Sequence, residues 1–213
     1  MTVQDAETHD RLLDAAARLF AARGFKDVTV REICRTARAN VAAVNYHYRD
    51  KQGLYHEVLR KAIDTMQATT EAARQAGQGG PPDQKLRAYV RVFLQRVAGQ
   101  GRDSWIHQLM MHEMADPTSA LDMIFDQVVR PRLIYVSELV AEVLGRPATD
   151  AAVLRCVLSI QSQVHAAMPN SLSKLLLPDL GADQRSLEDL ADHIAEFSLG
   201  GVRAISKVAS PNG

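Results

Sequence analysis

The sequence predicts an all-α protein, with an N-terminal three-helix bundle followed by a larger helical domain. Apolar residues recur three and four positions apart along almost the whole chain, which is the period of amphipathic helices. No segment shows a convincing alternation of apolar and polar residues, as a half-buried strand would. The chain has 213 residues and is 46% hydrophobic, enough for a substantial core in one or two domains. We expect two domains, over residues 1–52 and 53–213.

The first helix is expected over Thr8–Arg23. Its apolar residues form a single stripe at helical spacing, made of Leu12, Leu13, Ala16, Leu19 and Phe20. Gly24 follows at a position where a helix end favours a residue in the left-handed conformation. Phe25 can then fold back onto the stripe, so this helix offers an apolar surface to whatever comes next.

Two short helices come next, and each has its own start signal. Thr29 and Glu32 have the spacing of a capping box, while Asn40 can cap the second short helix and Asp50 the helix after it. The apolar positions have helical spacing: Val30, Ile33, Cys34 and Ala37, then Val41, Val44 and Tyr48. Helices of this length are marginal alone, so they must pack on the first helix. A helix, a tight turn and a second helix with polar and aromatic tips is typical of modules that enter the DNA major groove.

Helical patterns continue to the end of the chain. A long helix begins near Lys51, and the segment GQGGPP at residues 77–82 interrupts the pattern as a loop. A helical segment after Pro117 contains Pro131, which should kink or divide it. Further helices are expected over residues 83–98, 103–114, 149–168 and 186–206.

Charge and composition narrow the classes of function. The net charge is zero, but residues 1–60 hold 10 Lys/Arg against 8 Asp/Glu, a balance of +2 that leaves −2 for the rest. This modest basic bias predicts weak non-specific DNA binding and a need for two linked contact sites. No apolar run approaches a membrane span, and the acidic N-terminus does not resemble a secretory signal, so we expect a cytoplasmic protein. Cys34 and Cys156 are interpreted as buried free thiols, with a disulfide or a metal pair as the alternative.

The N-terminal residues resemble the tetracycline-repressor (TetR) family of bacterial transcriptional regulators. The matching segments are RLLDAAARLFAARGFKDVTVREI from Arg11 and VNYHYRDKQGLYHEVL from Val44. The wording ANVAAVNYHY, with HEMADPTSA from His112 and FSLGGVRA from Phe197, resembles the CecR-like branch. One departure is the turn Ala37–Asn40, where the family usually has glycine and this chain has Arg38. If Arg38 adopts a positive φ, the strain is roughly 1 kcal/mol or more relative to glycine, and a phosphate contact could offset it.

The resemblance implies a recognition helix over Asn40–Tyr46, with Val44 and Tyr48 pointing inward. Asparagine can bond adenine bidentately, arginine can bond guanine, and small apolar side chains can touch a thymine methyl. The expected DNA-binding residues are Thr29, Arg31, Val41, Ala42, Ala43, Asn45, Tyr46, His47 and Lys51. For Arg31 and Asn45 the alternative is an ordinary solvated surface residue, and for Thr29 the cap is the primary role.

The C-terminal domain is expected to bind a ligand and to form a homodimer. By resemblance, the last two long helices pair with their mates through Val153, Val157, Ile160, Val164, Leu190, Ile194, Phe197, Gly201 and Ile205. The alternative is that these stripes form intrachain core. Adaptable apolar side chains predict a ligand pocket, with plain core as the alternative for each: Phe93, Trp105, Leu109, Met110, Met114, Phe125, Val128 and His165.

These features predict a ligand-responsive transcriptional regulator, a repressor that binds a near-palindromic operator as a homodimer and is released by a small-molecule inducer. The alternative is an all-α small-molecule sensor or binding protein without operator binding. His107 and His112 are five residues apart, which does not suit a metal site on one helix face. We find no reactive constellation of an enzyme, and we expect no metal and no cofactor. The inducer, the operator and the choice between repressor and activator are not encoded in any recognisable motif.

Overall fold

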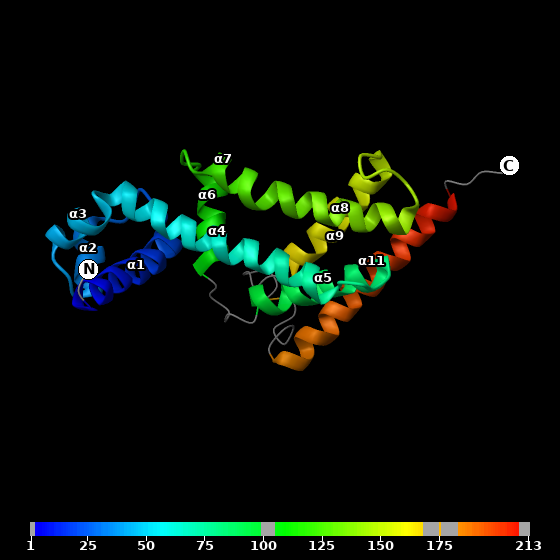
Figure 1. Cartoon of the computed structure of the whole chain (residues 1–213), viewed down its shortest axis with the longest axis horizontal. Coiled ribbons are helices and arrows are strands. Elements are labelled where there is room, and N and C mark those ends of the chain that lie inside the picture. Colours follow the sequence, from blue (N-terminus) through cyan, green and yellow to red (C-terminus); the bar gives the residue numbers. More distant parts are fainter. Residues whose placement is uncertain (1–2, 99–104, 168–174, 176–182, 209–213) are drawn as a thin grey trace. The chain divides into compact units, whose positions relative to one another are not determined.

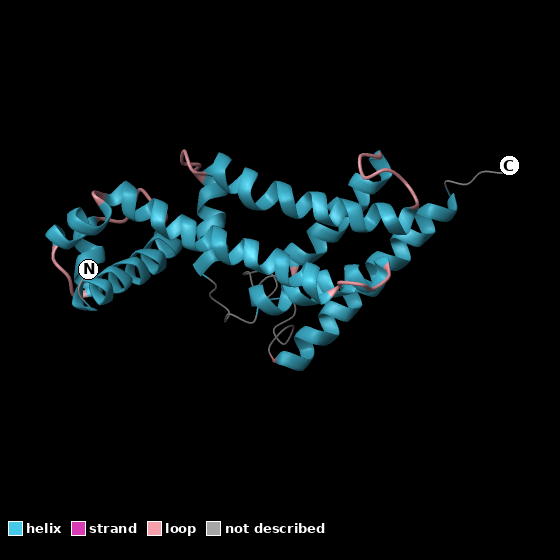
Figure 2. Ribbon diagram, in the orientation of Figure 1, coloured by secondary structure: helices cyan, strands magenta, loops and turns pink. Residues whose placement is uncertain are grey.

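The computed structural model describes residues 3–98, 105–167, 175 and 183–208. Within this part, helices are joined by short loops and turns, and there is no strand (Figure 2). The all-α prediction is therefore confirmed. Contacts divide the chain into two compact units, one over Met1–Thr65 and Asp103–Phe125, the other over Met66–Arg102 and Asp126–Gly213. A functional boundary at residue 52 remains a prediction.

The first unit is built on α1 (Val3–Arg23), α2 (Val30–Ala37) and α3 (Val41–Tyr48), drawn in blue in Figure 1. The first part of α4 (Lys51–Ala76) completes the bundle, and α6 (Trp105–Ala115) packs against α1. The core contains the apolar stripes expected from the sequence, and its fully buried members include Leu12, Phe20, Ile33, Val44, Leu54 and Leu59.

The turn after α1 is held by an aromatic cluster and by α6. Phe25 folds back as expected, and its ring lies 4.7 Å from that of Tyr55 and 5.9 Å from that of Phe20. Gly24 has a φ of 77°, and a Cβ added there would lie 3.2 Å from Nδ1 of His112. The left-handed glycine predicted at this helix end thus also permits the close approach of α6 to the turn.

The second unit contains the rest of α4, α5 (Pro82–Ala98), α8 (Arg130–Leu144), α9 (Ala151–Ala166) and α11 (Gln184–Val208). The long α11 packs on α5, α8 and α9, and α5 and α9 both pack on α8. Apolar side chains of these helices form one core, which includes a buried polar pair, in which Nε2 of Gln161 donates to the Tyr89 hydroxyl at 2.9 Å. Burial raises the pKa of Tyr89.

The segment around Pro131 divides as predicted, although the break precedes the proline. α7 (Leu121–Ile124) continues into a π-helical turn, η1 (Phe125–Val129), before α8 begins at Arg130. Pro131 is the second residue of α8 and follows η1 closely, so its missing N–H leaves out the backbone bond that a regular α-helix would make to residue 127.

Both cysteines are buried and free, Cys34 in the first unit and Cys156 in the second. Their burial agrees with the interpretation as buried free thiols. Burial raises the pKa of each thiol. No helix of the described part combines the length and the apolar content that crossing a membrane needs.

Candidate nucleic-acid interface

The start of α2 is a complete capping box, as the sequence predicts. The Thr29 hydroxyl accepts from the backbone N–H of Glu32, and the Glu32 carboxylate accepts from the Thr29 backbone N–H at 2.8 Å and from its hydroxyl at 2.7 Å. Arg23, in the last turn of α1, donates to the same carboxylate at 2.8 Å. The bond from Arg23, together with those from Thr29, lowers the pKa of Glu32 to about 2. Because the Thr29 hydroxyl donates to Glu32, it acts here as a cap and has no proton left for a phosphate.

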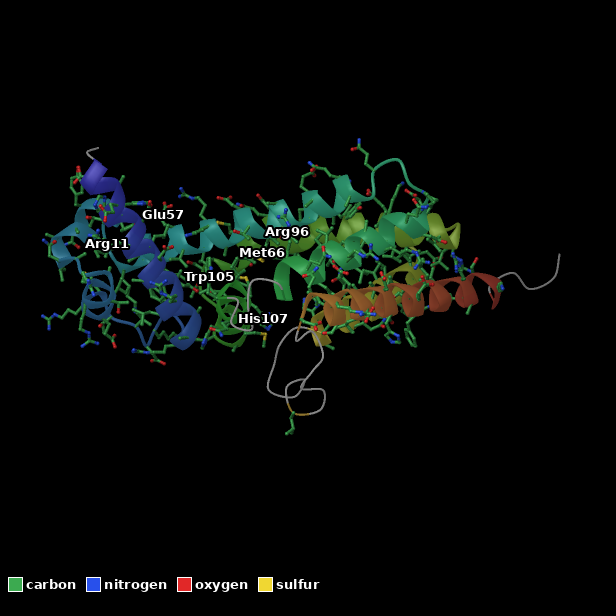
Figure 3. The ribbon with its side chains drawn as sticks, turned by 90° about the horizontal axis from the view of Figure 1, so that it is seen from below. Arg11, Glu57, Met66, Arg96, Trp105 and His107 are labelled. Atoms are coloured by element: carbon green, nitrogen blue, oxygen red, sulfur yellow. The ribbon has the colours of Figure 1, made fainter. Side chains whose placement is uncertain are left out.

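The turn between α2 and α3 uses a left-handed arginine. Arg38 has φ 52° and ψ 46°, and the next N–H, that of Ala39, donates to the Cys34 carbonyl at 2.9 Å. Nε of Arg11, on α1 (Figure 3), donates to the carbonyl of Ala37, the last residue of α2, at 3.2 Å. Asn40 then caps α3, because its Oδ1 accepts from the Ala43 N–H at 2.8 Å. The turn therefore keeps a helix-turn-helix geometry without glycine.

The inner side of α3 is anchored by Val44 and Tyr48, which are both buried as expected. The Tyr48 hydroxyl donates to the backbone carbonyl of His9 at 2.7 Å, and the two rings stack with centroids 4.9 Å apart. Burial raises the pKa of Tyr48, so the phenol stays a neutral hydrogen-bond donor. These contacts fix the rotation of α3 about its axis.

The outer side of α3 is the surface expected to read DNA. Tyr46 is 75% exposed, Val41 is 44% exposed, and Ala42 and Asn45 are exposed as well. Ala43 and His47 are half-buried, and the His47 ring lies 4.9 Å from that of Tyr46. The structure therefore leaves four of the nine expected residues, Val41, Ala42, Asn45 and Tyr46, exposed on a short helix.

The two expected basic residues differ in their surroundings. Arg31, in the first turn of α2, is exposed and makes no hydrogen bond or ion pair with the described residues. Lys51 is half-buried, and its ammonium lies 4.3 Å from the centre of the Phe25 ring and 3.4 Å from the Lys26 carbonyl. Burial lowers the pKa of Lys51. Arg31 thus offers an unengaged guanidinium, whereas Lys51 would have to leave its carbonyl partner to reach a phosphate.

The junction between α3 and α4 holds a residue that the sequence reading did not single out. Arg49 has φ 76° and ψ −52°, and it ends α3 with its N–H on the Asn45 carbonyl. Asp50 then caps α4, because its Oδ1 accepts from the Gly53 N–H at 2.8 Å. A Cβ added at Gly53 would lie 2.0 Å from the Tyr48 carbonyl oxygen, so only glycine fits there. The sequence does contain a signal for this tight junction: only two residues separate Tyr48, the last inward residue of α3, from Lys51, the first residue of α4.

A buried carboxylate on α6 also escaped the sequence reading. Glu113 is 1% exposed and accepts from the Tyr55 hydroxyl at 3.2 Å and from the Thr118 hydroxyl at 3.0 Å. The Thr118 backbone N–H donates to it as well. Lys26 pairs with Asp116 at 2.6 Å nearby. A glutamate at a helical core position gives no distinctive sequence pattern, so only the packing reveals that it joins α4 to the end of α6.

The eight residues expected to line a ligand pocket are divided between the two units. Five belong to the first unit, namely Trp105, Leu109, Met110, Met114 and Phe125, and three to the second, namely Phe93, Val128 and His165. Leu109, Phe93 and Val128 are buried, and Trp105 and Met110 are half-buried.

Three of the eight lie at the surface of the single chain. Met114 is 71% exposed, and Phe125 and His165 are exposed as well. The reason is helical phase: Met114 follows the buried Glu113 directly and so points away from the core. Two pockets of the described residues are lined by other residues. One, of about 480 Å³, lies between α1 and α4, and one of about 390 Å³ lies between α4, α5 and α8, the latter including Arg74, Lys85, Tyr135 and Glu142.

The expected dimer residues also divide, and five need correction. Val153, Val157, Ile160, Val164 and Ile194 are at most 4% exposed in the single chain, because they face α5, α8 and one another in the core of the second unit. Leu190 is half-buried, while Phe197, Gly201 and Ile205 are exposed on α11. The exposed apolar residues of α9 are instead Leu154 and Leu158. The residues predicted to form the dimer interface are thus the inner apolar side chains of α9 and some of the outer apolar side chains of α11.

Comparison with known proteins supports the assignment of the short helices. Residues 12–58 match the family described as "Bacterial regulatory proteins, tetR family". Residues 82–202, more than half of the chain, match the "HTH-type transcriptional dual regulator CecR, C-terminal domain". The matched families and relatives are transcriptional regulators and not enzymes.

Relatives and solved structures agree with this match. The chain is 25% identical over 162 residues to the HTH-type transcriptional dual regulator CecR of Shigella flexneri, covering 72% of each chain. It is 39% identical over 61 residues to the HTH-type transcriptional repressor KstR2 of Mycolicibacterium smegmatis, covering 30% of that protein. The fold is similar to that of a TetR-family regulator from Streptomyces coelicolor, with a TM-score of 0.70, 24% identity and coverage of 93% of this chain and 97% of that one. The chain therefore belongs to the TetR family of DNA-binding, helix-turn-helix transcriptional regulators, and its C-terminal part is of the CecR type.

Proposed function

We propose that this protein is a homodimeric repressor that binds a near-palindromic operator and is released by a small-molecule inducer. DNA binding is assigned to residues 1–52, and ligand binding and dimerisation to residues 53–213. The main support for DNA binding is the outer side of α3. Asn45 and Tyr46 are exposed there, on a helix that Val44 and Tyr48 anchor to the bundle. Operators of bacterial regulators lie on cytoplasmic DNA, so the proposal also assigns the protein to the cytoplasm.

The chemistry of this surface suits base recognition. The Asn45 amide can make paired bonds to an adenine edge, and the guanidinium of Arg31 can do so to guanine. Val41, Ala42 and Ala43 are small and leave room for the helix backbone to approach the bases. Tyr46 and His47 add hydroxyl and ring N–H groups suited to phosphates.

Dimerisation is supported by apolar side chains on the outer sides of two adjacent helices. On α9, Leu154 is 51% and Leu158 67% exposed, and on α11, Phe197 is 65% exposed. Ile205 lies two turns beyond Phe197, with Gly201 between them, so the three share one side of α11. Water-exposed apolar rows of this kind mark protein interaction surfaces. A two-fold axis through them would present two α3 helices to half-sites about one turn of DNA apart.

Induction is a shift between two populations of the dimer. A small molecule in the C-terminal domain would favour the state in which the two α3 helices no longer match the half-site spacing, limited by its differential affinity for the two states. The eight predicted pocket residues remain a hypothesis. Because Trp105 is the single tryptophan, its fluorescence offers a direct ligand screen.

The decisive experiment selects bound sequences from a random DNA pool and then measures binding to the selected duplex. Asn45→Ala and Arg31→Ala should each weaken binding by ~1–3 kcal/mol per base contact and relax sequence preference at one position. Lys51→Ala should weaken all sequences equally. Unchanged footprints for Asn45→Ala and Arg31→Ala would contradict the assigned contacts. A protein that ignores every duplex at low salt but still changes Trp105 fluorescence with a ligand would support the alternative, a sensor without operator binding.

A further inference from the structure

Two residues other than glycine have a positive φ in the part of the chain that the structure describes, and both are arginines beside α3. Arg38 has φ 52° and precedes α3, whereas Arg49 has φ 76° and follows it. The other positive-φ positions, Gly24, Gly79 and Gly145, are all glycines. A side chain with a Cβ is strained in this region, and arginine has none of the local hydrogen bonding that lets asparagine tolerate it.

The surroundings hold both arginines in these conformations. Arg38 lies between the Ala39 N–H bonded to Cys34 and the Ala37 carbonyl bonded to Arg11. Arg49 lies between the end of α3 and the Asp50 cap of α4, at a junction so close that Gly53 touches the Tyr48 carbonyl. Strain that is fixed by its surroundings in this way is typical of functional positions.

The two guanidinium groups have no partner in the described part of the protein. Both side chains are exposed, and neither makes a hydrogen bond, an ion pair or a stacking contact there. Arg31 is unengaged as well, whereas Arg11 pairs with Glu7, Arg23 with Glu32 and Arg60 with Glu57. Unpaired guanidinium groups suit a planar anionic partner from outside the chain, and phosphate accepts two parallel hydrogen bonds from arginine.

The length of α3 indicates where those phosphates lie. Eight residues of α-helix extend about 12 Å, close to the width of about 12 Å of the major groove. When α3 occupies the groove, its two ends therefore come near the two backbone strands. We propose that Arg38 and Arg49 form a phosphate clamp, one arginine on each strand, that seats α3 in the groove without reading sequence. The proposal rests on the role of α3 as the recognition helix.

A purely structural role is the competing explanation. Arg38 and Arg49 stand at the C-terminal ends of α2 and α3, where a cation interacts favourably with the helix dipole. Glycine at either site separates the two explanations, because it relieves the strain and removes the charge at once. If the two arginines form a phosphate clamp, the glycine variants are more stable than the wild type and bind DNA less tightly.

The test uses the full chain and two duplexes, the selected operator and a random sequence, titrated by fluorescence anisotropy over a range of salt. The variants are Arg38→Gly, Arg49→Gly, Arg38→Lys and Arg49→Lys, with Arg18→Ala as the control, an exposed arginine of α1. Each glycine variant should bind both duplexes about tenfold more weakly per lost contact at about 0.1 M salt, with the salt slope reduced by about 0.9 per contact. Its melting temperature should rise by about 2–4 °C. The lysine variants should keep most of the affinity, and Arg18→Ala should match the wild type.

The outcomes separate this proposal from the role of α3 itself. The clamp is overturned if both glycine variants keep the wild-type DNA affinity and salt slope while Asn45→Ala loses its preference for the operator. In that case α3 is still the helix that reads the sequence. Lower melting temperatures with unchanged DNA binding would likewise overturn it and favour the dipole role. The clamp is supported if the glycine variants lose as much affinity for the random duplex as for the operator, because phosphate contacts carry no sequence information.

Discussion

Glu32 joins three parts of the DNA-binding end at a single carboxylate. It accepts from Arg23 at the end of α1, and from both the backbone and the hydroxyl of Thr29 at the start of α2. Arg23 also donates to the Asp27 carbonyl in the connecting turn. The bonds from Arg23 and Thr29 to Glu32 favour its charged carboxylate, and together they orient the N-terminus of α2, in whose first turn Arg31 lies.

The first prediction concerns the pH dependence of stability. The pKa of Glu32 is lowered from its ordinary value of 4.5 to about 2, so its charged form stabilises the folded state. That contribution is complete above the unfolded pKa and is lost as the pH falls from 4.5 through about 2. Glu32→Gln should therefore be less stable than the wild type near neutral pH, and the difference should shrink through this acid range. Urea unfolding followed by circular dichroism measures it, with Glu71→Gln, on the exposed surface of α4, as the control. A difference independent of pH would contradict the role of the charge.

At the scale of the element, α2 and α3 are each eight residues long and depend on their ends. Helices of two turns do not persist alone in water. Here Thr29 and Asn40 cap the starts, while Arg38 and Arg49 end the helices in strained conformations. The inward side chains then hold each helix against α1 and α4. The orientation of the proposed reading surface is thus decided by the two junctions that bound α3.

The second prediction tests the junction after α3. Gly53→Ala would place a methyl group 2.0 Å from the Tyr48 carbonyl oxygen, a backbone atom that cannot turn away. We expect a loss of stability of about 1–3 kcal/mol, as for overpacked sites, and weaker operator binding because α3 must shift. Chemical unfolding and operator titration measure the two effects. Gln52→Ala changes the exposed neighbouring residue and should leave both nearly unchanged. A stable Gly53→Ala protein with normal operator affinity would show that the junction does not set the position of α3.

At the scale of the whole molecule, the proposed dimer depends on a surface that a single chain leaves exposed. The apolar side chains on the inner sides of α9 and α11 are buried in the core of the second unit, where they pack with side chains of α5 and α8. The outer stripes, with Leu154, Leu158, Phe197 and Ile205, remain at the surface. A modest basic bias in the DNA-binding residues makes one half-site contact weak, so operator affinity requires two linked contacts.

The third prediction is that a charge on the outer stripes separates the two chains. Leu158→Glu and Phe197→Glu should give monomers by light scattering, because a desolvated carboxylate without a partner opposes association. Operator affinity should fall by 10²-fold or more, about what the loss of avidity predicts, while helix content stays unchanged. Ile134→Glu is the matched control, since Ile134 is 53% exposed and belongs to a different helix, α8. If both variants remain dimers, the assignment of this surface to dimerisation is wrong.

Much of the secondary structure could be predicted because its signals are local. The helix starts at Thr29, Asn40 and Asp50, the loop after α4 and the division near Pro131 all follow from residue types a few positions apart. The inward roles of Val44 and Tyr48 follow from helical period alone. Glu113 could not be found in this way, because a buried carboxylate is recognisable only when its donors Tyr55 and Thr118 are brought beside it.

By itself, the sequence determined the helices, their caps and the family, since hydrogen bonding at a helix end and the period of apolar residues depend on near neighbours in the chain. Tertiary structure alone decided which apolar stripe of α9 is core, which predicted pocket residues are at the surface, and that Arg38 and Arg49 are strained beside α3. The physical reason is that an apolar side chain contributes the same pattern whether it packs on its own chain or on another. Only long-range packing distinguishes the two, because it determines which side of each helix is already covered.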